Sequence, residues 1–375
     1  MSWLTRNLSE LVTLQRGHDL PESHRAADGQ IPVVGSSGIT GVHDVARYPG
    51  PGVAIGRSGA SIGVATYVKE PYWPLNTCLF VTDFKGNDPR WVYWMLKGID
   101  FVGFNSGSAQ PSLNRNYLAG IPVYVPPRDV QAAIAEVLGA LDDKIAANER
   151  LSGAVQDLLQ ERFALLRLDG FTGDGSFLTV SDLFDVNPRT SQKLAGQAPY
   201  LGMKDLPDSS MTVGSWSTRE AKSGARFING DVLLARITPC LENGKAGYVD
   251  FLENTEVGVG STEFIVFRAR SPLLSAVPFF LTKSERFRDF AIKHMQGTSG
   301  RQRLAAADVA DYRLAKVDDE SLNRFGELSL SLLKRVKTAV SESRALARTR
   351  DELLPLLMNG KITVKDAEAV VSDAV

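Results

Sequence analysis

The sequence contains two copies of one pattern. Leu8–Leu11 (LSEL) recurs as Val180–Leu183 (VSDL), and Val53–Arg57 (VAIGR) recurs as Val232–Arg236 (VLLAR). Two further pairs follow in the same order, namely Ser106–Ala109 with Gln296–Ser299 and Asp157–Leu159 with Glu352–Leu354. The offset between the copies grows from 172 to 195 residues, so the copies are colinear and the second contains insertions. We therefore expect two modules, each a mixed, strand-rich segment followed by a long amphipathic helix. Two modules on two spacers suit a protein that binds one ligand at two places.

Length and composition agree with two modules in an ordinary globular chain. At about 150 residues per domain, 375 residues favour two or more domains. The first residues, Met1–Arg6, do not look like a signal peptide. Apolar stretches such as Leu273–Leu281 are far shorter than the ~20 residues of a membrane helix. Cys78 and Cys240 lie in opposite halves with no zinc-like spacing. We therefore expect a cytoplasmic protein in a reducing compartment.

Charge restricts the kind of partner. A net charge of −1 argues against a non-specific nucleic-acid coat protein but leaves a specific reader possible, because the distribution of charge matters more than its sum. The segment 283–303 is locally basic, whereas the first long helix (about 128–167) is acidic by comparison. The basic residues of this segment are Lys283, Arg286, Arg288, Lys293, Arg301 and Arg303, against Glu285 and Asp289.

The sequence of the first half predicts several short strands followed by a helix. Apolar runs bounded by Gly and Pro predict strands at 31–34, 52–55, 64–68 and 77–81. Asp88-Pro89 predicts an N-cap with proline at the first helical position, so a helix is expected from Arg90 to Lys97. Trp91, Tyr93 and Trp94 could stack on nucleic-acid bases, but their helical spacing favours a place in the core.

After residue 128 the apolar period changes to that of a helix. Steps of three and four residues predict one apolar stripe on each long helix, with Asn148, Ser343 and Arg350 in polar positions. Narrow stripes of this kind are typical of coiled-coil seams, and each helix is the obvious partner of the other. Two unrelated surface helices remain an alternative. Pro355 is expected to disturb the second helix, and Asn359-Gly360 to end it. The stripe residues are Ile134, Leu138, Leu141, Ile145, Leu151, Val155 and Leu158 in the first helix, and Phe325, Leu328, Leu332, Val336, Ala339, Leu346, Leu353 and Leu357 in the second.

Five segments stand in a fixed order along nearly the whole chain, namely Ile31–Asp44, Ile55–Gly59, Ile121–Pro127, Gly230–Thr238 and Leu353–Ile362. Together they resemble the specificity (S) subunit of type I restriction-modification enzymes. Ile31–Asp44 followed by Ile55–Gly59 resembles one class of target recognition domain, and Gly230–Thr238 is similar to the family's "GD-aliphatic-aliphatic-x-R" strand. Ile121–Pro127 resembles the start of the first long helix, and Leu353–Ile362 the terminal signature. The corresponding segment of the second half, Leu314–Asp318, lacks the prolines, so the boundary between the second domain and its helix is less well defined in the sequence.

The resemblance implies an α+β fold with two target recognition domains separated by two long helices that form an antiparallel coiled coil. The expected division is a first recognition domain at 1–127, a spacer helix at 128–170, a second recognition domain at 171–318, a second spacer helix at 319–361 and a tail at 362–375. It also implies a non-catalytic reader of double-stranded DNA, in which each domain recognises one half of a bipartite asymmetric site. Two methyltransferase (M) subunits would dock on the helices, and motor-nuclease (R) subunits would join the full enzyme.

The missing motifs agree with a chain that is not itself an enzyme. The Pro-Pro pair at Pro126 has the wrong neighbours for an adenine methyltransferase loop, and Gly360-Lys361-Ile362 lacks the upstream glycine and the Ser/Thr of a phosphate-binding loop. The four histidines are scattered, which disfavours a metal site. No cofactor is expected in this chain; the resemblance implies S-adenosylmethionine in the methyltransferase partner, and ATP and Mg²⁺ in the motor-nuclease. A catalytic component of a related restriction system and a two-module protein-binding scaffold remain the alternatives.

Candidate DNA contacts combine cations, amides and hydroxyls near glycines, the groups that read bases and phosphates. For Arg57 and Arg236 a structural ion pair is the alternative, and for Arg301, Gln302 and Arg303 a solvated turn. The candidates in the first half are Arg57, Ser58, Ser61, Ser108, Gln110, Asn114 and Arg115. Those in the second half are Arg236, Thr238, Asn243, Lys245, Thr298, Ser299, Arg301, Gln302 and Arg303.

Overall fold

A computed structural model describes residues 3–104, 112–170, 176–190, 196–220, 223–253, 255–298 and 300–374. The chain divides into two compact units. Unit 1 comprises Met1–Ile145 and Ser343–Val375, and unit 2 comprises Ala146–Glu342. The long helices α4 (Arg128–Leu166) and α9 (Asp319–Met358) each contribute a segment to both units.

Unit 1 is built on a four-stranded antiparallel sheet in the order β2-β8-β5-β6. Its strands are β2 (Thr13–Arg16), β8 (Cys78–Asp83), β5 (Gly52–Gly56) and β6 (Ala65–Val68). A second sheet joins β4 (Gly38–His43), β3 (Ile31–Gly35) and β7 (Trp73–Pro74), and a separate ribbon pairs β1 (Leu4–Asn7) with β9 (Pro122–Val125). The unit also holds the short helices α1 (Leu8–Leu11) and α3 (Arg115–Leu118). The strands predicted in the first half are all present.

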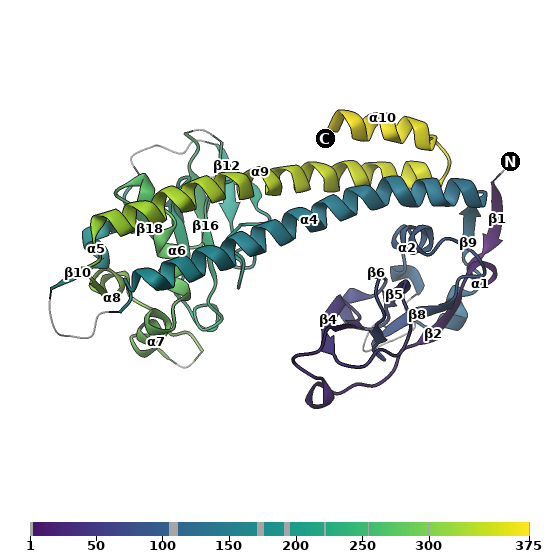
Figure 1. Ribbon diagram of the computed structural model, residues 1–375, viewed down its shortest axis with the longest axis horizontal. Coiled ribbons are helices and arrows are strands. Elements are labelled where there is room, and N and C mark those ends of the chain that lie inside the picture. Colours follow the sequence, from purple (N-terminus) through teal and green to yellow (C-terminus); the bar gives the residue numbers. More distant parts are fainter. Residues whose placement is uncertain are drawn as a thin grey trace. The chain divides into compact units, whose positions relative to one another are not determined.

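Helix α2 (Pro89–Lys97) packs against β5 and β6 (Figure 1). The Asp88 side chain caps it by accepting a hydrogen bond from the Trp91 amide at 2.8 Å, as the Asp-Pro pair predicted. Trp91 and Trp94 are fully buried in the core of unit 1. These two aromatic residues therefore belong to the core and are not available to stack on bases.

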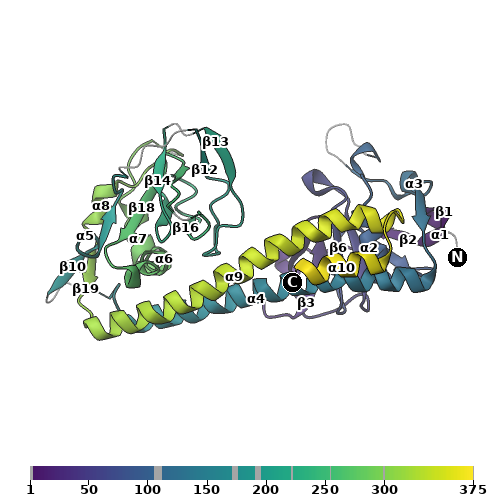
Figure 2. The same cartoon turned by 90° about the horizontal axis from the view of Figure 1, so that it is seen from above.

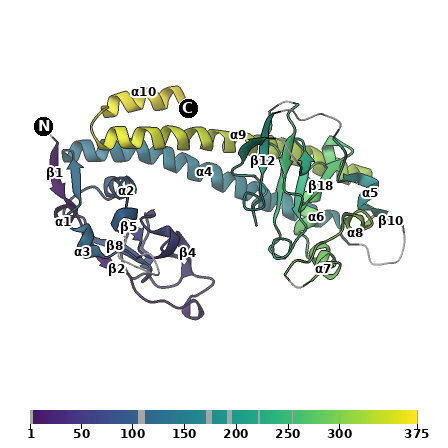
Figure 3. The same ribbon diagram turned by 180° about the vertical axis from the view of Figure 1, so that it is seen from behind.

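Unit 2 repeats this arrangement with longer connections. Its four-stranded sheet has the order β11-β18-β15-β16, and α6 packs against β15 and β16. Strand β18 of this sheet and helix α6 are labelled in Figure 3. A second sheet has the order β13-β12-β17-β14, and β10 pairs with β19 in a separate ribbon. The strands are β10 (Phe177–Thr179), β11 (Phe184–Val186), β12 (Gln197–Leu201), β13 (Ser217–Glu220), β14 (Ala225–Phe227), β15 (Val232–Ala235), β16 (Ala246–Tyr248), β17 (Gly258–Gly260), β18 (Phe264–Ala269) and β19 (Arg313–Ala315). The helices are α5 (Val180–Leu183), α6 (Val277–Lys283), α7 (Glu285–Lys293) and α8 (Ala306–Ala310).

Backbone hydrogen bonds show that the sequence repeat is also a structural repeat. The amide of Leu8 donates to the Ile121 carbonyl at 2.9 Å, and the amide of Val180 donates to the Tyr312 carbonyl at 3.0 Å. Both short helices that begin there have a capping box, formed by Asn7 and Glu10 in α1 and by Thr179 and Asp182 in α5. Strand β19 overlaps the start of the segment Leu314–Asp318 and pairs with β10 as β9 pairs with β1, so the loss of prolines there did not remove the element.

The long helices pair in antiparallel fashion within each unit (Figure 2). In unit 2 the Phe163 and Phe325 rings are 6.0 Å apart, and the Asn148 Nδ2 donates to the Ala339 carbonyl at 3.2 Å and to a Glu342 carboxylate oxygen at 2.7 Å. In unit 1 an ion pair of 2.6 Å joins Arg350 on α9 to Asp142 on α4. The α+β class and the paired helices predicted from the sequence are thus confirmed.

The position of the seam differs from the predicted stripe over part of its length. Leu151 and Leu158 are 42% and 37% exposed, whereas Val155 and Leu159 are buried. The seam instead passes through Asn148. A prediction from apolar residues alone leaves polar side chains out of the seam and assigns the neighbouring leucine to it. A polar residue with a partner on the facing helix can nevertheless lie in a seam. The prediction for Leu328, which is 37% exposed, was also wrong, because its polar neighbour Ser329 takes the buried position and donates to the Gly326 carbonyl of its own helix.

The end of the chain also departs from the prediction. Pro355 lies inside α9 and does not interrupt it, since the helix continues to Met358 with Leu353, Leu354 and Leu357 buried against the core. Gly360 has a φ of 70°, the left-handed conformation expected at the end of a helix. In place of a plain tail the chain then forms α10 (Val364–Ala374), whose Ala367 is fully buried (Figure 2). No helix in the described ranges is long and apolar enough to cross a membrane.

Candidate nucleic-acid interface

The two segments predicted to contact DNA in each half meet through the same backbone bond. In unit 1 the Leu113 amide donates to the Arg57 carbonyl at 2.8 Å, and in unit 2 the Leu304 amide donates to the Arg236 carbonyl, also at 2.8 Å. Each arginine follows the last residue of a central strand, β5 or β15. The end of a sheet strand and a distant loop therefore form one polar surface in each unit.

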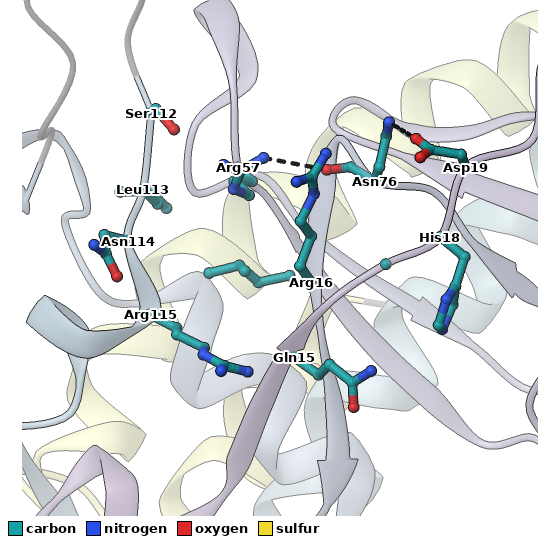
Figure 4. A pocket seen from close by; sticks show the side chains of 12 residues that line it. Gln15, Arg16, His18, Asp19, Arg57, Asn76, Ser112, Leu113, Asn114 and Arg115 are labelled. Carbon is teal, nitrogen blue, oxygen red and sulfur yellow. Dashed lines mark hydrogen bonds between the residues drawn. The ribbon is translucent and has the colours of Figure 1, made fainter.

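In unit 1 this surface is a cleft of about 690 Å³ (Figure 4). Three guanidinium groups line it, those of Arg16, Arg57 and Arg115. Arg57 Nη1 donates to the Asn76 backbone carbonyl at 3.3 Å. Asp19 is the one carboxylate among the lining residues, and the Asn76 side-chain amide is hydrogen-bonded to it. The other lining residues are Gln15, Gly17, His18, Leu79, Ser112, Leu113 and Asn114.

Sequence reasoning found part of this cleft and missed part of it. The predicted DNA contacts Arg57, Asn114 and Arg115 line it, whereas Gln15, Arg16 and Asn76 were not among the candidates. These missed residues lie on β2 and before β8, and only the strand order β2-β8-β5 places them beside Arg57. Polar residues at the ends of the predicted strands are the sequence feature from which these residues could have been chosen as candidates.

The remaining candidates of unit 1 have more limited roles or cannot be placed. Ser58 forms an isolated bridge with Ser112. Asn114, which lines the cleft, also caps α3 by accepting from the Asn116 amide at 3.0 Å. Ser61 lies in a single 3-10 turn (Gly59–Ser61) and is not among the residues that line the cleft. Ser108 and Gln110 lie outside the described residues.

In unit 2 the corresponding arginine is paired with a carboxylate. Glu263 Oε2 lies 3.5 Å from Arg236 Nε. The guanidinium of Arg303 donates to Glu263 from Nε at 2.9 and 3.0 Å and from Nη2 at 2.8 Å. The hydrogen bonds from Arg303 hold the pKa of Glu263 below its usual value. The ion pair considered for Arg236 is therefore present, and Arg303, for which a solvated turn was the alternative, forms one as well.

Thr238 and Gln302 lie together beside this network. The Thr238 amide donates to the Gln302 carbonyl at 3.1 Å, and the Gln302 amide donates to Thr238 Oγ1 at 3.2 Å. Arg301 and Thr298 are exposed on the adjoining turn. Ser299 lies outside the described residues.

Much of the basic segment of unit 2 holds loops in place. Lys283 Nζ donates to the carbonyls of Asp208 at 2.8 Å and Gly244 at 2.6 Å, and burial lowers the pKa of this lysine to about 8. Arg288 donates to the Glu242 carbonyl at 2.8 Å. Lys245, a predicted DNA contact, donates to the Leu206 carbonyl at 2.7 Å. Asn243 remains exposed on the loop that these contacts fix.

The motif residue Asp231 has a structural role. Its carboxylate is 1% exposed and accepts hydrogen bonds from Arg268 at 2.9 and 2.7 Å and from the Ile228 amide at 2.8 Å. Among the described residues no group of three or more His, Cys, Asp or Glu side chains could hold a metal ion. Cys78 is buried, which raises the pKa of its thiol to about 12, and Cys240 is half-buried.

Comparison with known proteins identifies a family model over the first part of the chain and curated relatives over about a third of its length. A family model described as "Type I restriction modification DNA specificity domain" matches residues 2–156. The specificity subunit of the type I restriction enzyme EcoAI from Escherichia coli is 30% identical over 134 residues, which is 34% of this chain and 22% of the relative. The EcoEI specificity subunit, also from Escherichia coli, is 29% identical over 146 residues, 36% of this chain and 24% of the relative. The alignments thus span about a quarter of the length of these curated relatives.

A solved structure extends the likeness to the whole chain. The S subunit of a type I restriction-modification system from M. genitalium has a TM-score of 0.61 at 15% identity, covering 95% of this chain and 96% of the solved one. At this identity the likeness establishes the fold. The predicted resemblance is therefore confirmed by sequence over residues 2–156, and the solved structure shows the same fold over 95% of the chain.

Proposed function

Since this chain is a relative of the type I restriction-modification specificity subunits, we propose that it reads the sequence of double-stranded DNA. In this proposal each unit recognises one half of a bipartite, asymmetric site. The chain itself is non-catalytic and needs no cofactor of its own.

One observation supports this proposal most strongly. The same strand-to-loop junction occurs in both units, at Arg57–Leu113 and at Arg236–Leu304. Each junction gathers guanidinium, amide and hydroxyl groups, which are the groups that bind guanine, adenine and phosphate oxygens. Two such surfaces in one chain suit a ligand that offers two short stretches of sequence.

The partners that we propose are two methyltransferase subunits, joined in the full complex by motor-nuclease subunits. Exposed leucines on α4 support a docked partner. Leu151, Leu158 and Leu165 are 42%, 37% and 71% exposed and lie seven residues apart, so they follow one side of the helix. S-adenosylmethionine would then be bound by the methyltransferase, ATP and Mg²⁺ by the motor-nuclease, and the complex would work in the cytoplasm.

Two alternative functions differ from this one in what the chain would bind. In the first, the chain is a catalytic component of a related restriction system; binding of S-adenosylmethionine by the isolated chain would support it. In the second, the chain is a two-module protein scaffold without sequence-selective DNA binding. The names of the relatives, all specificity subunits, favour the reader.

The test is selection of bound duplexes from a randomised pool by the full chain together with its methyltransferase subunits. We expect one motif with two defined halves and an unspecified spacer. Enrichment of no motif, with a complex that forms normally, would contradict the proposal and favour the scaffold.

A further inference from the structure

The carboxylate of Glu263 joins two cations that come from different parts of unit 2. Arg236 follows β15, and Arg303 belongs to the loop before α8. The amide of Arg236 also donates to the Glu263 carbonyl at 3.0 Å. This backbone hydrogen bond holds the main chain of Glu263, from which its side chain extends, beside Arg236. The Glu263 side chain is 24% exposed, and its charge therefore lies at the edge of the candidate interface.

This pairing leaves Arg303 few groups with which to read a base. Bidentate recognition of guanine needs two parallel N–H donors of one guanidinium. In Arg303 the Nε and Nη2 donors are bonded to Glu263, and Nη1 lies 3.3 Å from the Arg301 carbonyl as a donor. An arginine held in this way positions its loop and does not present a free fork to DNA.

The loop that Arg303 holds carries Gln302. Two backbone hydrogen bonds between Gln296 and Arg303, at 3.0 and 2.9 Å, close the loop, and Gln302 is fixed against Thr238 through its backbone. Amide and hydroxyl side chains of this kind form hydrogen bonds with base edges, and glutamine suits adenine.

We propose that Glu263 is a specificity-determining and positioning residue of unit 2. It pairs with Arg236 and Arg303 and fixes the loop, so that this half-site is read by Gln302 and Thr238 and guanine readout by the two arginines is suppressed. The proposal rests on the DNA-reading function proposed above. Release of the carboxylate charge would free two guanidinium groups at the interface.

The experiment compares Glu263→Gln with the unchanged protein, each as the full chain with its methyltransferase subunits. Duplexes selected from a randomised pool give the motif, and the half-site of unit 2 is the one that Arg16→Ala in unit 1 leaves unaltered. For Glu263→Gln we expect guanine to become accepted in this half-site and discrimination there to fall about tenfold, the loss of one specific base contact. The salt dependence of binding should steepen, because freed cations reach phosphates.

Asp185→Asn is the matched control. It removes a carboxylate of the same unit that pairs with Arg270 at 3.1 Å, where both side chains are about half exposed. We expect it to leave the motif and the salt dependence unchanged. Arg303→Lys keeps the charge with fewer bonds to Glu263, so it should change the same half-site less than Glu263→Gln does.

The outcomes separate this inference from the function on which it rests. If the folded Glu263→Gln complex keeps the unchanged motif and salt dependence, Glu263 is only structural and the inference is wrong. If that variant does not fold, as followed by its thermal unfolding midpoint, an unaltered motif for Arg303→Lys would overturn it instead. If the unchanged protein selects no motif, the proposed function itself fails.

Discussion

Units 1 and 2 share the same arrangement of strands but differ in the charged residues at the two ends of the central strand. At the start of the central strand, unit 1 has Gly52 packed on Tyr72, whereas unit 2 has Asp231 buried against Arg268. At the end of that strand, Arg57 contacts a backbone carbonyl, whereas Arg236 faces the Glu263 carboxylate. A repeated framework can thus present an open cationic cleft in one copy and arginines paired with a carboxylate in the other, as expected of modules that read different sequences.

The largest expected effect tests the start of the strand in unit 2. Asp231→Ala would leave Arg268 half-buried without its partner and remove the cap on the Ile228 amide. Loss of one partner of a buried pair costs about 3–5 kcal/mol. Hydrogen exchange should show lower protection in the strands of unit 2 and little change in those of unit 1. An equal loss of protection in both units would contradict this expectation and show that the two units unfold together.

A smaller loss is expected at the matching position of unit 1. A Cβ at Gly52 would lie 2.2 Å from a Tyr72 ring carbon, and Tyr72 is only 1% exposed and cannot move into solvent. Gly52→Ala should therefore destabilise unit 1 by about 1–3 kcal/mol, the range for overpacking. Protection of the β5 and β8 amides from exchange measures it. Gly153→Ala, at a helical site with no neighbour within 4 Å of the added carbon, is the control and should not destabilise the protein.

The role of the charge difference between the units can be tested by placing a carboxylate in unit 1 where unit 2 has one. Thr77 corresponds to Glu263, because its carbonyl accepts from the Arg57 amide at 2.9 Å as that of Glu263 does from Arg236. Thr77→Glu should partly neutralise Arg57 and weaken binding by about 1 kcal/mol, with a shallower salt dependence. Thr82→Glu adds the same charge at an exposed site on β8 and should have less effect. Equal weakening by both variants would show that only net charge matters.

The smallest effect on stability is expected on the outer side of α4. Leu158→Ser should change the free energy of unfolding by less than about 0.5 kcal/mol, as for other exposed sites. It should nevertheless reduce co-purification of the methyltransferase if Leu158 lies under a docked partner. Leu159→Ser, at the fully buried neighbour, should destabilise the protein instead. Undiminished complex formation by Leu158→Ser would remove the support for docking there.

The sequence predicted features that depend on neighbouring residues, such as the strands, the Asp88 cap and the repeat itself. It predicted Arg57 and Arg115 because cations stand out near glycines. It missed Arg16 and Asn76, which reach the cleft only through the pairing of β2, β8 and β5. It also could not foresee the pairing of Arg303 with Glu263, since 40 residues separate them and no local pattern links them.

The most direct test of the account asks whether the two units read separate halves of one site. The full chain with its methyltransferase subunits would carry either Arg57→Ala or Gln302→Ala, and the preferred duplexes of each variant would be sequenced from a randomised pool. We expect Arg57→Ala to relax one half-site and Gln302→Ala the other, each by about 1–3 kcal/mol for a lost bidentate base contact. If either substitution relaxed both half-sites together, the account of two independent readers would be contradicted.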